Sequence, residues 1–103
     1  MAKQRGAPRT KTHLPEDVRQ RLLNAFAEDL RDYRTAAGLT QHQLGTLALM
    51  HFSEIGLLER GQREPRLGTL IKLASALDLP LERLLETATG VYEYIPRSGW
   101  RET

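Results

Sequence analysis

The segment from residue 40 to residue 66 has the sequence TQHQLGTLALMHFSEIGLLERGQREPR, and the rest of the chain is organised around it. Thr40 is a favourable helix N-cap, and Gln43 three residues later completes a capping box. A short helix is therefore expected to begin directly after Thr40. Its apolar residues Leu44 and Leu47 are expected to face the core.

A tight turn at Leu49–His51 and a second short helix from Phe52 to Arg60 are expected next. Ile55 and Leu58 are three residues apart and form the expected buried pair of this helix. Gly61 is expected to end it, because glycine accepts the left-handed backbone that often follows a helix. The segment therefore predicts two short helices joined by a turn.

Two features lie inside or beside these helices. Gly45 falls within the first one, where glycine costs about 1 kcal/mol relative to alanine. Such a cost predicts a compensating reason, and close approach of another helix is the simplest. The stretch from Gly61 to Arg66 contains Pro65 and is expected to be a loop.

A long amphipathic helix of roughly 20 residues is expected before this segment. Pro15 lies where a first helical turn tolerates proline, and Gly38 is expected to end the helix. Apolar residues recur at three- and four-residue steps along one face: Val18, Leu22, Phe26, Leu30, Tyr33 and Ala37. The expected solvent side carries Arg19, Arg21, Glu28, Asp29 and Arg31.

Two further helices are expected after the loop. The apolar residues of the fourth helix are Leu67, Leu70, Ile71, Ala74 and Leu77. Pro80 is expected to open a short fifth helix, with Asp78 or Leu79 as its cap and with Leu81, Leu84 and Leu85 inside. Five helices with short connections predict an all-α single domain.

The two ends of the chain differ from the helical part. Residues 1–13 are basic, contain Gly6 and Pro8, and are expected to form a disordered arm. The domain itself is expected to span 14–87, leaving 88–103 as a short C-terminal tail. Within that tail, Val91–Ile95 is rich in β-branched and aromatic residues, which favours a short strand or a dimerisation segment.

Composition excludes several classes of protein. The 103-residue chain has no cysteine, so a disulfide framework and a thiolate metal site are both excluded. His13, His42 and His51 are not spaced for a metal site, and no catalytic triad is visible, so no cofactor and no enzymatic activity are expected. No apolar run approaches the ~20 residues of a membrane span, and a cytoplasmic protein is expected.

Basic residues are clustered, although the net charge is only +2. The arm carries Lys3, Arg5, Arg9 and Lys11 without an acidic residue, and a second group, Arg60, Arg63 and Arg66, follows the central helices. Such clusters suit a phosphate backbone, and they equally suit simple solubility. Charge alone leaves both interpretations open.

The chain resembles the Cro-type phage-repressor (XRE) helix-turn-helix family from about Leu30 to Leu85. Three patterns at the family's spacing carry the resemblance: Leu30-x-x-x-Arg34-x-x-x-Gly38-Leu39-Thr40-Gln41, Glu59-Arg60-Gly61-x-Arg63-x-Pro65, and Thr69-Leu70-x-Lys72-Leu73-Ala74-x-Ala76-Leu77. The resemblance implies a five-helix domain whose third helix enters the major groove of double-stranded DNA. It also implies that Arg34 and Glu59 form a structural ion pair beneath that helix.

The resemblance assigns DNA-contacting residues by position. It places base-edge contacts at Phe52, Ser53 and Leu57, with His51 and Gly56 beside them in the DNA-binding surface. It places phosphate contacts at Gln41, Arg60, Gln62 and Arg63. Phe52 and Leu57 stand where the family often has polar residues, so they would contact thymine methyl groups or a protein partner.

Two residues of the turn also depart from the family pattern. Leu49 stands where glycine is usual, so either it adopts a conformation less suited to a side chain or the turn differs slightly. His51 stands where the cap of the third helix is usually serine or threonine.

The resulting hypothesis is a sequence-specific DNA-binding transcriptional regulator, expected to be a repressor and a homodimer. The expected dimer surface is the fifth helix together with the tail segment 91–100. The alternative is a protein-interaction module on the same fold, such as an antitoxin or an adaptor of another regulator, which would bind its partner through the C-terminal tail.

Overall fold

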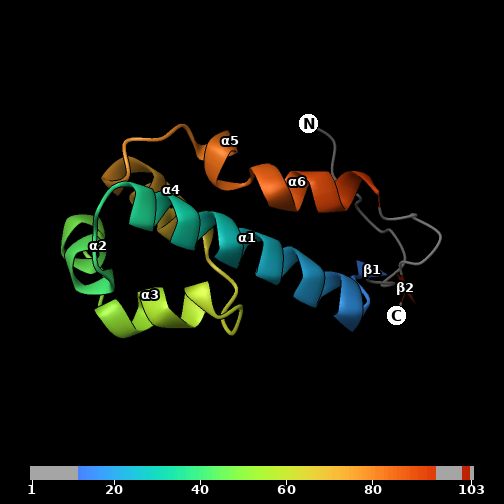
Figure 1. The fold of residues 1–103 in the computed structure, drawn as a ribbon. Helices are drawn as coiled ribbons and strands as arrows, with labels where there is room; N and C mark the ends of the chain where they lie inside the picture. The colour runs from blue at the N-terminus through green and yellow to red at the C-terminus, as the bar shows by residue number, and fades with distance from the viewer. Residues whose placement is uncertain (1–11, 95–100, 103) are drawn as a thin grey trace, which may run out of the picture.

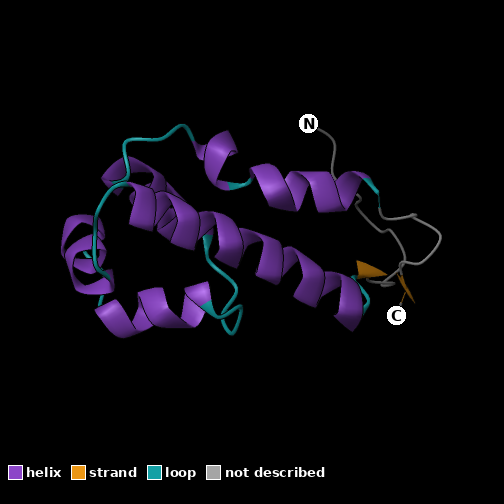
Figure 2. Cartoon of the chain, in the orientation of Figure 1, coloured by secondary structure: helices purple, strands orange, loops and turns teal. Residues whose placement is uncertain are grey.

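The computed structural model describes residues 12–94 and 101–102, and this part of the chain is almost wholly helical (Figures 1 and 2). The helices are α1 (Glu16–Ala36), α2 (Gln41–Ala48), α3 (Phe52–Glu59), α4 (Leu67–Ala76), α5 (Leu81–Leu84) and α6 (Glu86–Glu93). Strands β1 (Thr12–His13) and β2 (Arg101–Glu102) form a short antiparallel pair. The all-α prediction is confirmed, with one more helix than the five expected. Residues 1–11 of the predicted arm lie outside the described residues.

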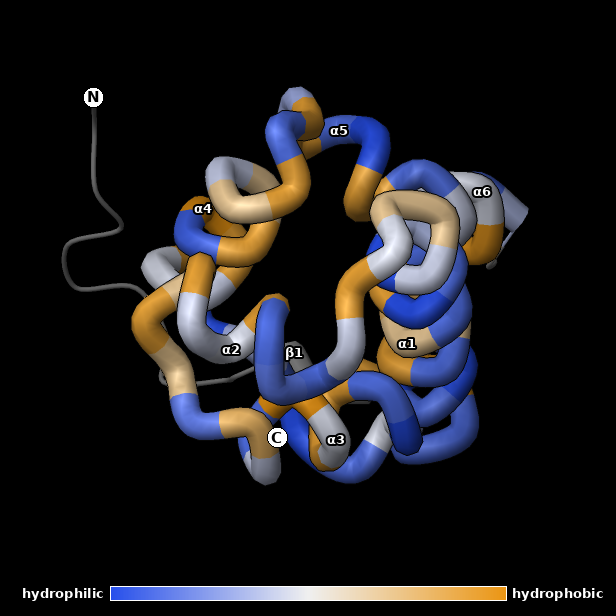
Figure 3. The backbone as a smooth tube through the Cα atoms, turned by 60° about the vertical axis from the view of Figure 1, so that its left-hand side comes forward, coloured by the Kyte–Doolittle hydropathy of each residue, from blue (hydrophilic) through white to orange (hydrophobic). Residues whose placement is uncertain are grey.

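The long helix α1 packs against α3, α5 and α6, while α2 packs on α3 and α4, and α4 packs on α5. Helices α2, α3 and α4 lie around its C-terminal half, and α6 runs along its N-terminal half (Figure 1). Glu16 and Asp17 occupy its first turn, where the helix dipole favours negative charge. Gly38, with φ of 73°, follows its end in the left-handed conformation that the sequence predicted. Apolar and hydrophilic residues alternate along α1, as an amphipathic helix requires (Figure 3).

The core is built from six fully buried leucine and isoleucine side chains: Leu30, Leu44, Ile55, Leu58, Leu73 and Leu84. They come from α1, α2, α3, α4 and α5, so every helix except α6 contributes. Burying each such side chain contributes about 1.5–3 kcal/mol relative to leaving it in water. The core therefore ties the turn-containing segment 40–66 to its supports.

Three expected core residues are instead exposed. Leu47 is 56% exposed because Leu44 and Ala48, one turn apart, already fill the inner face of α2. Leu67 and Ile71 are 70% and 51% exposed. The buried residues of α4 are Leu73 and Ala74, of which Ala74 belonged to the expected apolar stripe and Leu73 did not.

The predicted strand at Val91–Ile95 is wrong over its described part, because α6 continues through Glu93. Asp29, expected on the solvent side of α1, is buried and accepts hydrogen bonds from the backbone N–H of Thr87 at 2.9 Å and from its hydroxyl at 2.6 Å. This carboxylate lies at the N-terminus of α6, where free N–H groups and the helix dipole favour an anion. The predicted domain boundary after Thr87 thus falls inside a helix that packs on α1.

The cap of α5 also differs from the prediction. Pro80 is the N-cap residue and makes no side-chain cap hydrogen bond, so neither Asp78 nor Leu79 has that role. Asp78 has φ of 56°, one of two non-glycine residues with positive φ in the described chain. A left-handed aspartate at the end of α4 reverses the chain before α5, a role for which aspartate is better suited than most residues.

We expect Asp29→Ala to lower the free energy of unfolding by about 1–3 kcal/mol, because it leaves the partly buried N–H of Thr87 without an acceptor. Urea denaturation followed by far-UV circular dichroism measures the change. The matched control is Asp32→Ala, which removes an exposed carboxylate one turn away on the same helix. Equal effects of the two substitutions would contradict a capping role for Asp29.

Candidate nucleic-acid interface

Helix α2 begins with the predicted capping box. The N–H of Gln43 donates to the Thr40 hydroxyl oxygen at 3.1 Å, and the N–H of Thr40 donates to Gln43 Oε1 at 2.9 Å. Both bonds are local and require only the residue types at their three-residue spacing. The start of the helix-turn-helix is therefore determined by the sequence around it.

The turn between α2 and α3 explains Gly45. A Cβ atom there would lie 2.6 Å from the carbonyl oxygen of Met50 and 3.4 Å from the backbone of Phe52. The predicted close approach is thus real, and it comes from the turn and the start of α3. Leu49 takes the left-handed conformation (φ 57°, ψ 46°), the first of the two possibilities that the sequence left open. Its side chain is exposed, so the turn presents an apolar group to solvent.

The N-terminus of α3 is capped by His51, as the sequence indicated. Its Nδ1 accepts a hydrogen bond from the N–H of Ser53 at 3.1 Å and lies 2.7 Å from the Ser53 hydroxyl oxygen. An imidazole nitrogen thus replaces the hydroxyl oxygen of the usual serine or threonine cap. His51 and Ser53 are joined to each other and both remain exposed.

Phe52 is stacked on two imidazoles. Its ring centroid lies 3.9 Å from that of His42 on α2, with 22° between the planes, and 4.6 Å from that of His51, with 29° between the planes. The side chain is still 38% exposed. His42 was not among the predicted site residues, because its contact with Phe52 arises only when α2 and α3 are folded against each other. The predicted reading residues His51, Phe52 and Ser53 form one cluster.

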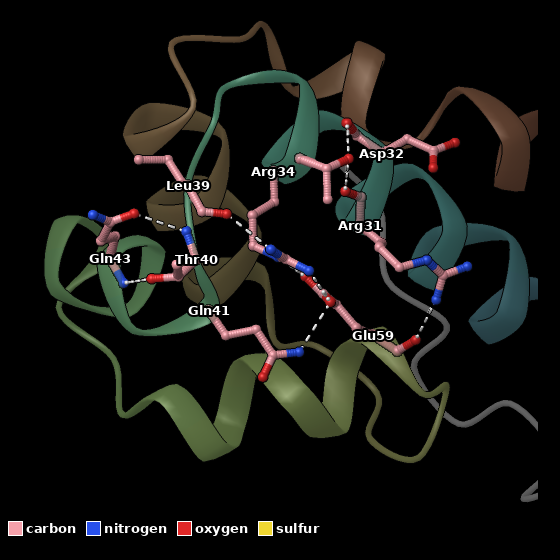
Figure 4. Close-up of polar contacts among 9 residues, drawn as sticks. Arg31, Asp32, Arg34, Leu39, Thr40, Gln41, Gln43 and Glu59 are labelled. Atoms are coloured by element: carbon pink, nitrogen blue, oxygen red, sulfur yellow. Dashed lines mark hydrogen bonds and ion pairs between the residues drawn. The ribbon is translucent and has the colours of Figure 1, made fainter.

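The predicted ion pair is present beneath α3 (Figure 4). Arg34 Nε and Nη2 donate to the two carboxylate oxygens of Glu59 at 2.6 and 3.0 Å, and Arg34 Nη1 donates to the carbonyl oxygen of Leu39 at 2.8 Å. The side chains are 13% and 4% exposed. The hydrogen bond to Glu59 raises the pKa of Arg34 above its ordinary value, against the opposing effect of burial. The pair joins α1, the loop before α2, and α3.

Gln41 is held by the same carboxylate. Its Nε2 donates to Glu59 Oε1 at 3.1 Å, and Arg31 Nη1 donates to the Glu59 carbonyl oxygen at 3.3 Å (Figure 4). The sequence predicted Gln41 as a phosphate contact and did not predict its bond to Glu59. Because Gln41 is the first residue of α2, this bond holds the N-terminus of that helix against the end of α3.

Gly56 lies beneath two of the predicted phosphate-contacting residues. A Cβ atom at this position would lie 3.1 Å from Arg60 Nη1 and 3.6 Å from Gln41 Oε1. Gly56 is buried, so its contribution is the space that it leaves for these two side chains. Arg60 Nε also donates to Gln62 Oε1 at 3.1 Å. Gln41, Arg60 and Gln62 are thus brought together beside α3.

The remaining predicted residues lie apart from that group. Arg63 Nη1 donates to Glu54 Oε2 at 2.9 Å, an ion pair with partly exposed side chains. Glu54 belongs to the first turn of α3 and was not predicted to contribute. Leu57 is only half-buried, so part of its side chain is available at the surface of α3.

Two side chains of α1 hold the loop that follows α3. Gln20 Nε2 donates to the carbonyl oxygen of Gly61 at 3.0 Å, and Arg19 Nε donates to Glu64 Oε1 at 3.1 Å. Gly61 has φ of 68°, and a Cβ atom there would lie 2.5 Å from Asn24 Oδ1. These contacts couple α1 to the loop that carries Gln62 and Arg63. No sequence motif had indicated them.

The chain belongs to the HTH_3 helix-turn-helix family of DNA-binding transcriptional regulators, whose model matches residues 30–84. This confirms the resemblance inferred from the sequence. The match covers the part of the chain from the second half of α1 to the end of α5. The first half of α1 and the helix α6 that packs along it lie outside the matched region.

Relatives of this chain include the control protein C.SmaI of Serratia marcescens, 42% identical over 60 residues that make up 58% of this chain and 71% of that protein. The transcriptional repressor RghR of Bacillus subtilis is 36% identical over 72 residues, 69% of this chain and 53% of RghR. The restriction-modification controller protein C.AhdI of Aeromonas hydrophila has a similar structure, with 44% identity and a TM-score of 0.59 over 60% of this chain and 94% of C.AhdI. All three are named as control proteins or transcriptional regulators.

No helix in residues 12–94 has the length and apolar character needed to cross a membrane. Within the same described part, no group of three or more histidine, aspartate or glutamate side chains is arranged to hold a metal ion. The basic and polar surface beside α3 therefore remains the principal candidate site of the described chain.

We expect Arg34→Ala to destabilise the fold by about 3 kcal/mol or more, since it leaves the Glu59 carboxylate buried without its cation. Arg34→Lys keeps the charge but cannot form the two-pronged contact, so it should lose less stability than Arg34→Ala. Thermal and urea unfolding measure both, with Arg21→Ala on the exposed face of α1 as the control. If Arg34→Ala loses no more stability than the control, the Arg34–Glu59 ion pair does not make the expected contribution to the stability of the fold.

We expect Gly56→Ala to separate stability from DNA affinity. The alanine removes the cost of glycine inside α3, up to about 1 kcal/mol, while its Cβ displaces the flexible end of Arg60, which lies 3.1 Å from that position. Unfolding stability should therefore stay level or rise, and affinity for duplex DNA should fall. Gly90→Ala is the matched control, because nothing lies within 4 Å of a Cβ at that position of α6. Unchanged DNA affinity of Gly56→Ala would argue against a role for the Arg60–Gln41 arrangement.

Proposed function

We propose that this protein is a sequence-specific repressor of transcription that binds double-stranded DNA as a homodimer and acts in the cytoplasm. Helix α3 enters the major groove, whose width admits one α-helix. The observation that carries the proposal is the grouping of Gln41, Arg60 and Gln62 beside α3, while His51, Phe52 and Ser53 stand exposed at its N-terminus.

The proposed phosphate contacts are Gln41, Arg60, Gln62 and Arg63. Gln41 is the first residue of α2, so unsatisfied backbone N–H groups lie beside its side chain and favour an anion. Arg60 and Arg63 are exposed cations whose partners, Gln62 and Glu54, are themselves at the surface. Exchanging such partners for a phosphate releases counterions from DNA and makes binding dependent on salt.

The proposed base contacts are His51, Phe52, Ser53 and Leu57. Phe52 and Leu57 would contact thymine methyl groups, which carry sequence information in the major groove. Gly56 would not reach a base, because it is buried beneath Arg60 and Gln41. It contributes instead by allowing those side chains to lie close to α3.

Repression is proposed from the relatives. RghR is named as a repressor, and C.SmaI and C.AhdI are named as control or controller proteins. The chain spans 71% of C.SmaI but only about half of RghR, so the comparison with RghR concerns a part of that protein. The part they share includes the helix-turn-helix.

A homodimer is proposed because a single module of this size has little surface for a tight, specific site. The dimer surface expected from sequence is the fifth helix with residues 91–100, and part of that segment has another position than expected. Helix α6 includes Val91 and packs on α1, while residues 95–100 lie outside the described part. Exposed Leu67 and Ile71 on α4, with Leu47 on the neighbouring α2, favour the alternative that a protein partner binds this fold.

The decisive experiment measures binding to duplex DNA across a range of salt concentrations. We expect the logarithm of the association constant to fall linearly with the logarithm of salt concentration. Arg60→Ala and Arg63→Ala should each reduce the slope by about 0.9, the value for one phosphate contact. Arg83→Ala is the control, because this exposed arginine lies on α5 away from the proposed surface.

Binding that does not depend on salt would reject the DNA-binding proposal and favour the protein-partner alternative. A slope that Arg60→Ala and Arg63→Ala leave unchanged would reject only the assignment of those contacts. Sedimentation of the intact chain, alone and with a palindromic duplex, tests the homodimer in the same samples. A chain that remains monomeric and binds one per palindrome would reject it.

A further inference from the structure

The hydrogen bonds at the N-terminus of α3 determine which nitrogen of His51 carries the proton. The backbone N–H of Ser53 can only donate, and it points to His51 Nδ1 at 3.1 Å. Nδ1 must therefore be the acceptor nitrogen of a neutral imidazole. The other nitrogen, Nε2, then carries the hydrogen and is a donor.

This arrangement also determines the role of the Ser53 hydroxyl. Its oxygen lies 2.7 Å from His51 Nδ1, and since Nδ1 has no hydrogen, the hydroxyl must be the donor of that contact. Ser53 has only one hydroxyl hydrogen, which is now directed at His51. What remains available at the exposed surface of Ser53 is the pair of oxygen lone pairs, so the side chain can only accept.

We propose that Ser53 recognises a base that carries an exocyclic amino group, and that His51 is the residue that makes it selective. A serine hydroxyl ordinarily contacts either a donor or an acceptor on a base edge. Here only the adenine N6 and cytosine N4 amino groups can donate to it, whereas the guanine O6 and thymine O4 atoms cannot. The inference rests on the proposed function, because it names the bases that the same surface would select.

The neighbouring Phe52 favours adenine over cytosine. His42 on α2 and His51 at the cap of α3 are stacked on its ring, which remains partly exposed beside Ser53. An adenine read at N6 is paired with thymine, whose methyl group projects into the same groove and suits an apolar contact. A cytosine is paired with guanine, which offers no methyl group. We therefore expect Ser53 to lie opposite an adenine of an A·T pair.

His42 is a positioning residue in this arrangement. It lies in the first turn of α2 and its ring is stacked on Phe52, so it limits the orientations that the phenyl ring can adopt. Removing the His42 ring should weaken the preference for thymine at the position that Phe52 contacts. The preference of Ser53 for an amino group should remain.

The test is a selection of bound duplexes from a random library, carried out with the wild type and with Ser53→Ala. The position whose preference differs between the two selections is the one that Ser53 contacts. The wild type should select adenine there, and Ser53→Ala should discriminate about 5- to 10-fold less among the four bases, a value at the lower end for one specific contact. Replacing that adenine by purine, which lacks the N6 amino group, should weaken binding by the wild type about 5- to 10-fold and leave Ser53→Ala unaffected.

Two substitutions of His51 separate helix capping from selectivity. Asparagine retains an oxygen that accepts from both the N–H and the hydroxyl of Ser53, so His51→Asn should keep the preference for an amino group. His51→Ala frees the hydroxyl hydrogen, so the variant should also accept guanine or thymine at the Ser53 position. Circular dichroism of each variant checks that it is folded, and the purine substitution tests the wild-type protein without any variant.

The outcomes distinguish this inference from the proposed function. A wild type that binds no duplex in a salt-dependent manner would reject both. Salt-dependent binding with guanine or thymine at the Ser53 position, or with no effect of the purine substitution, would overturn the inference and leave DNA binding intact. Selection of cytosine would retain Ser53 as an acceptor and overturn the contribution assigned to Phe52.

Discussion

The two-pronged contact between Arg34 and Glu59 is the interaction on which the rest of the interface depends. It joins the end of α1 to the end of α3, and the same two side chains also hold the Leu39 carbonyl and Gln41. A buried ion pair adds little net stability compared with apolar residues of the same size, but loss of one partner is costly. Its main physical effect is therefore geometric, since it fixes the orientation of α3 relative to α1 and to the start of α2.

The part of the fold predicted from sequence is the part whose signals are local. Thr40 and Gln43 form their capping box within one turn of helix, and Gly45 is required by the turn that follows directly. The region after Thr87 was not predicted, because its β-branched and aromatic residues favour a strand when considered alone. Packing of α6 on α1 and the cap from Asp29, 58 residues earlier in the chain, outweigh that preference.

The candidate site shows the same division. Its proposed residues are those that the resemblance to the Cro-type family implied, and the Arg34–Glu59 contact that the resemblance also implied is present. The contributions of His42 and Glu54 were missed, since each depends on how a side chain meets another element after folding. The apolar pattern on α4 included both Ala74 and Leu67, and only the packed structure shows that Ala74 is buried and Leu67 is exposed.

The space above Gly56 has a consequence for how this surface can change in evolution. A Cβ atom at residue 56 would lie 3.1 Å from Arg60 Nη1 and 3.6 Å from Gln41 Oε1, so a larger side chain there would displace the end of Arg60. Positions 41, 56 and 60 are therefore expected to covary among homologues, with a larger residue at 56 accompanied by a shorter or differently directed one at 60. A side chain at residue 56 that contacted DNA would be accompanied by a second substitution at residue 60. This part of α3 is therefore expected to diverge more slowly than its exposed N-terminus.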